Sequence, residues 1–293
     1  MTPKRVCLLG FGEVGQALAQ DLRPRVERLS AWDLKFSDAA SAPSRAAPRL
    51  EVLAARNATD AVAEAELVIS AVTAAQIGAA ARSVAPYLSA NAYFFDLNST
   101  SPAEKRAAAV VIDSAGGRFV EAAIMSPIAP LRSASPMLLG GAHVAGFLPL
   151  ASELGFKGAE AFSEKLGAAS AAKICRSVVV KGIEALLLES LLTARTHGVE
   201  QEVLGSLQKL LPVDDWQSFG RYMISRALIH GRRRAEEMRE AARTVSEAGF
   251  TPRMSGACAE WQEWASRHSD AANADLETML DALLAAQRAG DAG

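Results

Sequence analysis

Two different patterns of hydrophobic and polar positions follow one another along the chain. In the first half, short runs rich in β-branched and aromatic residues alternate with alanine-rich stretches that favour helices. Strands are predicted over residues 6–10, 29–34, 50–54, 67–72, 93–97, 119–125, 136–141 and 159–162, and the Ser/Ala/Pro-rich segment 41–48 is predicted to be a loop. Strands that alternate with helices form right-handed βαβ units, so this half predicts an α/β domain with a doubly wound parallel sheet.

From about Gly167 onward, the spacing of apolar residues is helical and no further strand is predicted. Helices are expected over residues 168–196, 205–211, 216–248, 257–267 and 275–288. The pattern therefore predicts two domains, an α/β domain over residues 1–165 and an all-α domain over residues 166–293. The chain length of 293 residues agrees with this, since a domain has about 150 residues.

Charge and cysteine content exclude several classes of protein. The 31 Lys and Arg residues nearly balance the 33 Asp and Glu residues, so the chain has no general attraction for nucleic acid or an anionic membrane. No run reaches the roughly 18 apolar residues of a transmembrane helix. Cys7, Cys175 and Cys258 fit neither a disulfide framework nor a zinc site, and the four histidines lack metal-ligand spacing. We expect a cytoplasmic protein with no metal, membrane or nucleic acid as partner.

A glycine motif follows the first predicted strand directly and opens the first helix. Its residues are Gly10, Phe11, Gly12, Glu13, Val14 and Gly15. In a dinucleotide-binding Rossmann fold, the first glycine allows a tight turn and the second lets the pyrophosphate approach the backbone. The third lets the helix pack closely on the strand, and the phosphates lie on the free N–H groups at the helix N-terminus. The motif therefore predicts that the first domain is a Rossmann-type domain that binds a dinucleotide cofactor.

The cofactor is predicted from Asp33, at the end of the second expected strand. This carboxylate lies 23 positions after Gly10, where it would accept hydrogen bonds from the adenosine ribose. It would also repel the additional phosphate of NADP, so NAD is the expected cofactor. Lys35, two positions further on, leaves NADP open as the alternative.

Two more segments complete a resemblance to a known family. Asp96-Leu-Asn98-Ser99-Thr100-Ser-Pro102 is similar to the motif D-x-S-T-x-x-P, and Gly167-Ala-Ala-Ser-Ala-Ala-Lys173 is similar to G-x-G-x-x-x-K. With the glycine motif, they make nearly the whole chain resemble the β-hydroxyacid dehydrogenase superfamily, which includes 3-hydroxyisobutyrate and 6-phosphogluconate dehydrogenases. The resemblance implies that Lys173 is the general acid/base and that the serine segment holds the substrate.

The resemblance also implies the remaining contacts. Substrate contacts are expected at Asn98, Ser99, Thr100, Ser126 and Arg176, and further cofactor contacts at Val72 and Thr73. Several positions depart from the family: Ala169 replaces a glycine, Arg176 replaces an asparagine, and the segment Glu121–Pro127 replaces D-A-P-V-S-G-G. The lysine of a later K-D pair is missing near Glu236 and Glu237. These departures indicate a poorly characterised branch with its own C-terminal helical domain.

Helical spacing gives an independent interpretation of the lysine segment. At about 100° per residue, Lys173, Ser177, Lys181 and Glu184 fall on one stripe of an otherwise apolar helix. The stripe could face a cleft, where burial would lower the pKa of Lys173 toward neutrality and suit it to proton transfer. It could equally be a solvated face with an ion pair between Lys181 and Glu184. The resemblance favours the first interpretation for Lys173.

Other polar and aromatic residues of the second half have simpler interpretations. The charges after His230 alternate in sign and favour a solvated helix face, with substrate binding by His230 and an arginine as the alternative. Trp216, Trp261 and Trp264 are expected to anchor helix packing. Part of the apolar surface of this half is expected to be buried between two protomers of a homodimer.

These features predict an NAD-dependent dehydrogenase of the β-hydroxyacid type. Hydride would pass between a nicotinamide and a small hydroxy acid or sugar acid, while Lys173 takes or returns the hydroxyl proton. An imine reductase or a sugar-acid oxidoisomerase of the same superfamily is an alternative. A non-catalytic dinucleotide-binding sensor or assembly subunit is another, although such a protein needs neither Ser99 nor Lys173.

Overall fold

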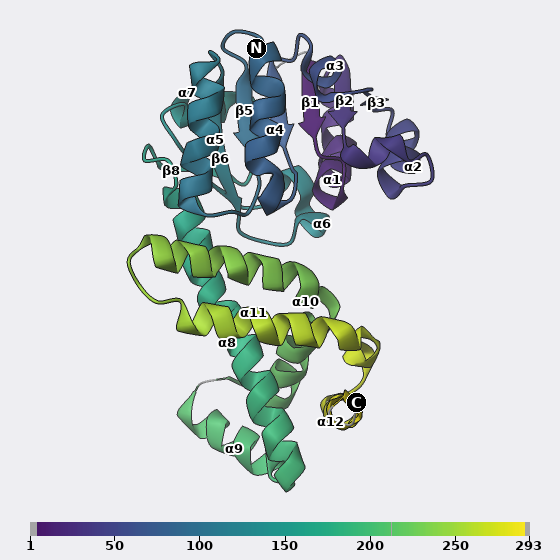
Figure 1. The fold of residues 1–293 in the computed structure, drawn as a ribbon, viewed down its shortest axis with the longest axis vertical. Coiled ribbons are helices and arrows are strands. Elements are labelled where there is room, and N and C mark those ends of the chain that lie inside the picture. Colours follow the sequence, from purple (N-terminus) through teal and green to yellow (C-terminus); the bar gives the residue numbers. More distant parts are fainter. Residues whose placement is uncertain (1–4, 212, 291–293) are drawn as a thin grey trace. The chain divides into compact units, whose positions relative to one another are not determined.

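The computed structural model describes residues 5–211 and 213–290, which form two compact units (Figure 1). The first unit extends to Ile174 and the second begins at Cys175. The division lies inside helix α8 (Ala168–His197), whose first turns belong to the first unit, whereas the sequence places a boundary near residue 165.

An eight-stranded sheet forms the centre of the first unit among the described residues. The strands are β1 (Arg5–Leu9), β2 (Arg28–Trp32), β3 (Leu53–Ala54), β4 (Leu67–Ser70), β5 (Tyr93–Asp96), β6 (Arg118–Ile124), β7 (Met137–Gly140) and β8 (Ala159–Ser163). Their order is β3-β2-β1-β4-β5-β6-β7-β8, and β7 runs antiparallel to β6 while the other neighbours are parallel. The predicted α/β fold is confirmed, with the doubly wound strand order of a dinucleotide-binding domain.

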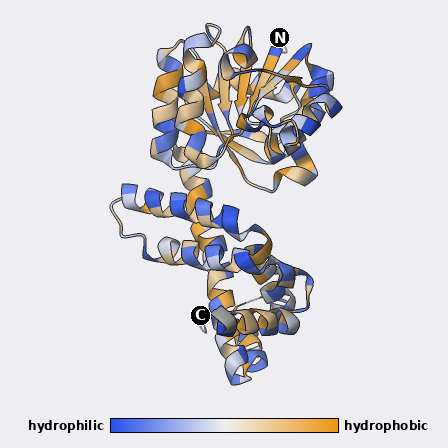
Figure 2. Ribbon diagram, turned by 45° about the vertical axis from the view of Figure 1, so that its right-hand side comes forward, coloured by the Kyte–Doolittle hydropathy of each residue, from blue (hydrophilic) through white to orange (hydrophobic). Residues whose placement is uncertain are grey.

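Helices cover both faces of this sheet. They are α1 (Glu13–Leu22), α2 (Ala42–Arg49), α3 (Ala58–Val62), α4 (Ile77–Val84), α5 (Pro102–Ser114), α6 (Ile128–Leu131) and α7 (Val144–Glu153). Leu8 packs in a core with α1, α2 and α7, whereas its neighbours Cys7 and Leu9 pack in a second core with α3, α4 and α5. Strands β1, β4 and β5 are buried on both faces and consist mostly of hydrophobic residues, as the orange strands of Figure 2 show, whereas β3 and β8 are largely exposed.

The segment predicted as a loop over residues 41–48 is instead helix α2, so this prediction was wrong. Ser41 caps the helix, since its hydroxyl accepts a hydrogen bond from the N–H of Ser44 at 3.2 Å. Pro43 lies in the first turn, where its missing N–H needs no partner. Ala46 and Ala47 are buried against the sheet, and this packing stabilises a helix that the proline content had argued against.

The second unit contains helices and no strand among its described residues, as predicted. After α8 come α9 (Glu200–Leu210), α10 (Trp216–Glu247), α11 (Arg253–Ala265) and α12 (Leu276–Gly290). Its core includes Trp216, with Trp261 and Trp264 packed against it, which confirms that these three residues anchor helix packing. Within the part of the chain that the structure describes, no helix has the length and apolar content needed to span a bilayer.

Candidate functional site

The predicted contacts of the first unit gather at one edge of the sheet. Strands β1, β4, β5 and β6 are parallel, so their carboxyl ends meet at this edge. The glycine motif follows β1, Val72 and Thr73 follow β4, Asn98 to Thr100 follow β5, and Ser126 follows β6. Strand order reverses between β1 and β4, and open α/β sheets bind ligands at such a switch point.

The glycine motif has the backbone that the sequence predicts for it. Gly10 adopts a φ of +94°, and a Cβ atom there would lie 2.4 Å from the carbonyl oxygen of Ala71. A Cβ on Gly15 would lie 2.3 Å from the carbonyl oxygen of Gly10, so α1 and β1 approach each other as closely as glycine permits. Gly10 and Gly15 are therefore required by the fold itself.

Gly12 differs, because a Cβ atom added there would have no neighbour within 4 Å. The residue is the N-cap of α1 and has no side chain to cap the helix. The N–H groups of the first turn, from Glu13 to Gly15, have no partner within the helix and are suited to bind an anion. The open space and the uncapped helix end fit the pyrophosphate of a dinucleotide.

Asp33 joins the end of β2 to this loop. One oxygen of its carboxylate accepts a hydrogen bond from the N–H of Phe11 at 2.8 Å, and the other accepts from the N–H of Lys35 at 2.9 Å. Phe11 itself is buried and packs on Phe36, so it contributes only its backbone to the site. A carboxylate has about four acceptor positions, which leaves two on Asp33 for ribose hydroxyls.

A buried polar network supports the segment after β5. The Asp96 carboxylate forms an ion pair with Lys105 of α5, and both side chains are fully buried. The side-chain amide of Asn98 donates to Asp96 and, at 2.8 Å, to Ser70 at the end of β4. Burial raises the pKa of Asp96, and the ammonium of Lys105 opposes that rise. The network therefore fixes Asn98 between two strand ends.

The predicted substrate segment is mostly enclosed. Asn98 and Thr100 are buried, whereas Ser99 is half-buried. The side-chain oxygen of Asn98 is buried without a hydrogen-bond partner among the described residues. Because an unsatisfied buried acceptor is costly, this oxygen is suited to accept a bond from a bound ligand.

The segment that follows Ser126 is bound to α1 at Arg132 and Ser133. Asp21 of α1 accepts hydrogen bonds from the hydroxyl of Ser133 at 2.7 Å and from Arg132 at 2.9 Å. Ser126 is half-buried at the carboxyl end of β6, where the sequence places it.

Lys173 lies in the second turn of α8 and is half-buried. The helix begins after Gly167, which has a φ of +93°. A Cβ atom on Gly167 would lie 3.0 Å from Cβ of Pro102, the residue that ends the Asn98–Pro102 segment. The start of the lysine helix therefore contacts the substrate segment within the first unit.

The rest of the predicted polar stripe belongs to the second unit. Lys181 forms an ion pair with Glu237 at 2.9 Å, and Glu184 pairs with Arg234 and accepts from Gln262 at 2.9 Å. Burial raises the pKa of Glu184, and Arg234 opposes that rise. These bonds connect α8 to α10 and α11, so Lys181 and Glu184 stabilise the helical unit. This arrangement differs from the predicted pair of Lys181 with Glu184.

Two further candidates lie in the second unit. Arg176 is exposed on α8, just beyond the division between the units. His230 is half-buried on α10 and lies 2.8 Å from a guanidinium nitrogen of Arg226. Within the described residues, no group of three or more His, Cys, Asp or Glu side chains could hold a metal ion.

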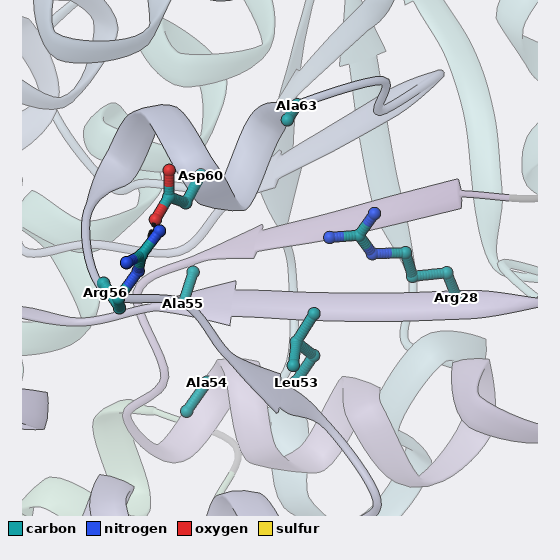
Figure 3. A pocket seen from close by; sticks show the side chains of 7 residues that line it. All are labelled: Arg28, Leu53, Ala54, Ala55, Arg56, Asp60 and Ala63. Atoms are coloured by element: carbon teal, nitrogen blue, oxygen red, sulfur yellow. Dashed lines mark hydrogen bonds and ion pairs between the residues drawn. The ribbon is translucent and has the colours of Figure 1, made fainter.

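A shallow hollow of about 380 Å³ lies elsewhere, along the β2–β3 edge of the sheet (Figure 3). It is lined by Arg28, Leu53 and the ion pair of Arg56 with Asp60, among others. It contains none of the predicted site residues.

Sequence reasoning missed two buried charges that support the site. Lys105 is fully buried behind the substrate segment. Glu121 of β6 is fully buried and binds the start of α8. The signal for Glu121 was a single acidic residue inside an otherwise apolar strand.

Comparison with known families agrees with this geometry. Residues 5–145 match the NAD binding domain of 6-phosphogluconate dehydrogenase. Residues 194–265 match a domain of unknown function, DUF1932. The first match shows that the Rossmann unit is a nicotinamide-dinucleotide-binding domain.

Solved structures extend the similarity over nearly the whole chain. A conserved hypothetical protein from Sinorhizobium meliloti 1021 is 35% identical, with 96% of each chain covered and a TM-score of 0.78. A conserved protein of unknown function, described as structurally similar to 3-hydroxyacid dehydrogenases, is 29% identical, with 90% of this chain and 97% of its own covered and a TM-score of 0.71. The 3-hydroxyisobutyrate dehydrogenase of Mycobacterium tuberculosis, solved with L-serine, shares the fold at 19% identity, with 97% and 99% covered and a TM-score of 0.72.

Proposed function

The chain belongs to the β-hydroxyacid dehydrogenase superfamily, and we propose that it is an NAD-dependent dehydrogenase of a small hydroxy acid or sugar acid. The observation that carries this proposal is the contact between Gly167 and Pro102, because it brings the helix of Lys173 to the substrate segment. A protein that only senses or carries a dinucleotide would need neither feature.

The cofactor is held by the residues at the carboxyl edge of the sheet. The N–H groups of Glu13 to Gly15 bind the pyrophosphate, Asp33 binds the adenosine ribose, and Val72 and Thr73 line the cofactor after β4. When bound, the nicotinamide supplies the hydride acceptor or donor.

Lys173 is the general acid/base in this proposal. Its amine takes the proton from the substrate hydroxyl during oxidation and returns it during reduction. The substrate acid is oriented by Asn98, Ser99, Thr100 and Ser126. Asn98 is suited to this task because its position is fixed by Asp96 and Ser70 while its oxygen stays available.

The proposal is tested with a panel of hydroxy acids and sugar acids, each incubated with the protein and either NAD or NADP. Reduction of the cofactor, followed by its fluorescence, is expected for at least one acid. If the protein binds the dinucleotide but no acid reduces it, and no keto acid oxidises the reduced cofactor, the proposal is wrong, which leaves the imine reductase and the non-catalytic sensor or assembly subunit.

Cofactor choice gives a sharper prediction. Calorimetric titration should show that the wild type binds NAD at least about tenfold more tightly than NADP, because the Asp33 carboxylate repels the 2′-phosphate. Asp33→Asn removes the charge and keeps an acceptor for the N–H of Phe11 but not for that of Lys35, so it should reduce the preference for NAD over NADP at the cost of one hydrogen bond. Equal affinity of the wild type for both cofactors would show that Asp33 does not select NAD.

We also propose a homodimer formed by the second unit. Tyr222 and Ile229, seven positions apart on α10, stay 57% and 52% exposed, and Leu186 on α8 stays 56% exposed. Exposed apolar groups at helical spacing are typical of an interface between protomers.

Light scattering at micromolar concentration should therefore give the mass of a dimer. Ile229→Lys should shift it toward the monomer, because a charge would be placed in an apolar interface. Val110→Lys, which changes a still more exposed position on α5 in the first unit, is the control and should leave the mass unchanged. A monomeric wild type would contradict the proposal.

A further inference from the structure

Glu121 is a buried charge that the proposed chemistry does not use. It lies in the middle of β6, is fully buried, and faces Gly140 of the antiparallel neighbour β7. A Cβ atom on Gly140 would lie 2.3 Å from Oε1 of Glu121, so only glycine leaves room for the carboxylate. Gly140 therefore leaves space in the sheet for the carboxylate of Glu121.

The carboxylate binds the first turn of α8 through three hydrogen bonds. Its Oε1 accepts from the N–H of Gly167 at 2.7 Å and from the N–H of Ala169 at 3.2 Å, and its Oε2 accepts from the hydroxyl of Ser170 at 2.8 Å. Charged acceptors at a helix N-terminus form strong hydrogen bonds and match the positive end of the helix dipole. The bonds compensate the cost of burying the charge.

These bonds fix the helix one turn before Lys173. Ser170 is three positions and Ala169 four positions before Lys173, the spacings at which helical residues share one face. Gly167, whose N–H binds Glu121, also lies against Pro102 of the substrate segment. The start of α8 is therefore held between β6 and the segment that we expect to bind substrate.

We infer that Glu121 is a positioning residue for Lys173: by binding Gly167, Ala169 and Ser170, it sets the direction in which α8 presents its lysine to the substrate. The inference rests on the proposed function, because it gives Glu121 a role only if Lys173 is the acid/base. Glu121 itself does not touch substrate.

The test compares kcat with cofactor affinity. Glu121→Gln keeps the size of the side chain and an oxygen for the two N–H groups but removes the charge. It should lower kcat about tenfold, since small displacements of a catalytic group are costly, while the dissociation constant of NAD stays within about twofold. Ser170→Ala, which removes one of the three bonds, should have a smaller effect in the same direction.

A double variant separates positioning from general stabilisation. If Glu121 acts through Lys173, adding Glu121→Gln to Lys173→Ala should lower kcat no further, whereas independent effects would multiply. Hydrogen exchange provides a readout without substrate: the amides of Gly167 and Ala169 should exchange faster in Glu121→Gln than in the wild type.

The outcomes are distinguishable. If Lys173→Ala keeps wild-type turnover, another group moves the proton, and the proposed role of Lys173 fails together with the inference about Glu121. If Lys173→Ala loses turnover but Glu121→Gln keeps both its kcat and the slow amide exchange, only the inference about Glu121 is overturned. If Glu121→Gln does not fold, Ser170→Ala and its double variant with Lys173→Ala decide the question in the same way.

Discussion

Lys173→Ala should lower kcat by about 10²- to 10⁴-fold, the usual contribution of a general acid or base. The affinity for NAD should stay nearly unchanged, because the residues proposed to hold the dinucleotide follow β1, β2 and β4, whereas Lys173 lies on α8. Lys173→Arg should not restore turnover, since a guanidinium does not release its proton near neutral pH. The measurement is steady-state kinetics together with calorimetric titration of the cofactor.

The matched control is Lys165→Ala, which removes an exposed lysine just before α8. Its kcat should equal that of the wild type. Lys181 is a poor control, because its buried ion pair with Glu237 connects two helices and its loss affects stability. Near-wild-type turnover of Lys173→Ala would mean that another group moves the proton.

The loss of Lys105 is expected to have a large effect on folding stability. Lys105→Met should lower the free energy of unfolding by about 3–5 kcal/mol, because it leaves the fully buried Asp96 carboxylate without its cation. Chemical denaturation at neutral pH measures this. The double variant Asp96→Asn with Lys105→Met removes both charges and should recover most of the loss.

The loss of folding stability in Lys105→Met should also depend on pH. Burial raises the pKa of Asp96 in the folded protein, and the loss of the lysine raises it further. In the unfolded chain the pKa of an aspartate is about 3.9. When the pKa is higher in the folded protein, the protein becomes less stable as the pH rises from the unfolded pKa through the folded pKa. The variant should therefore be closer to the wild type at about pH 5 than at about pH 8. A deficit that grows toward acid pH would contradict the assignment.

Much of the first unit follows from local sequence. Strands buried on both faces form continuous apolar runs, so β4 with Leu67, Val68 and Ile69 is recognisable without its neighbours. The glycine motif is also recognisable from local sequence, because Gly10 and Gly15 are required by close backbone contacts within the turn and with the end of the neighbouring strand. Helix α2 was missed because its stability depends on burial of Ala46 and Ala47, which a propensity argument does not include.

The partners of the buried charges could not be predicted in the same way. Glu121 and Gly167 are 46 positions apart, and Glu184 and Arg234 are 50 positions apart. Which cation pairs with which carboxylate is decided by the packing of elements far apart in the chain. Helical spacing predicted an ion pair between Lys181 and Glu184, but each of them forms its ion pair with a different residue of α10.

We propose that this protein moves a hydride directly between a substrate carbon and the nicotinamide. The test uses a hydroxy acid that carries deuterium on its carbinol carbon and is turned over by the wild type with NAD. Mass spectrometry should find one deuterium in the reduced cofactor for each keto acid formed, with the hydroxyl proton released to solvent. Keto acid that forms without deuterium in the cofactor would contradict the claim.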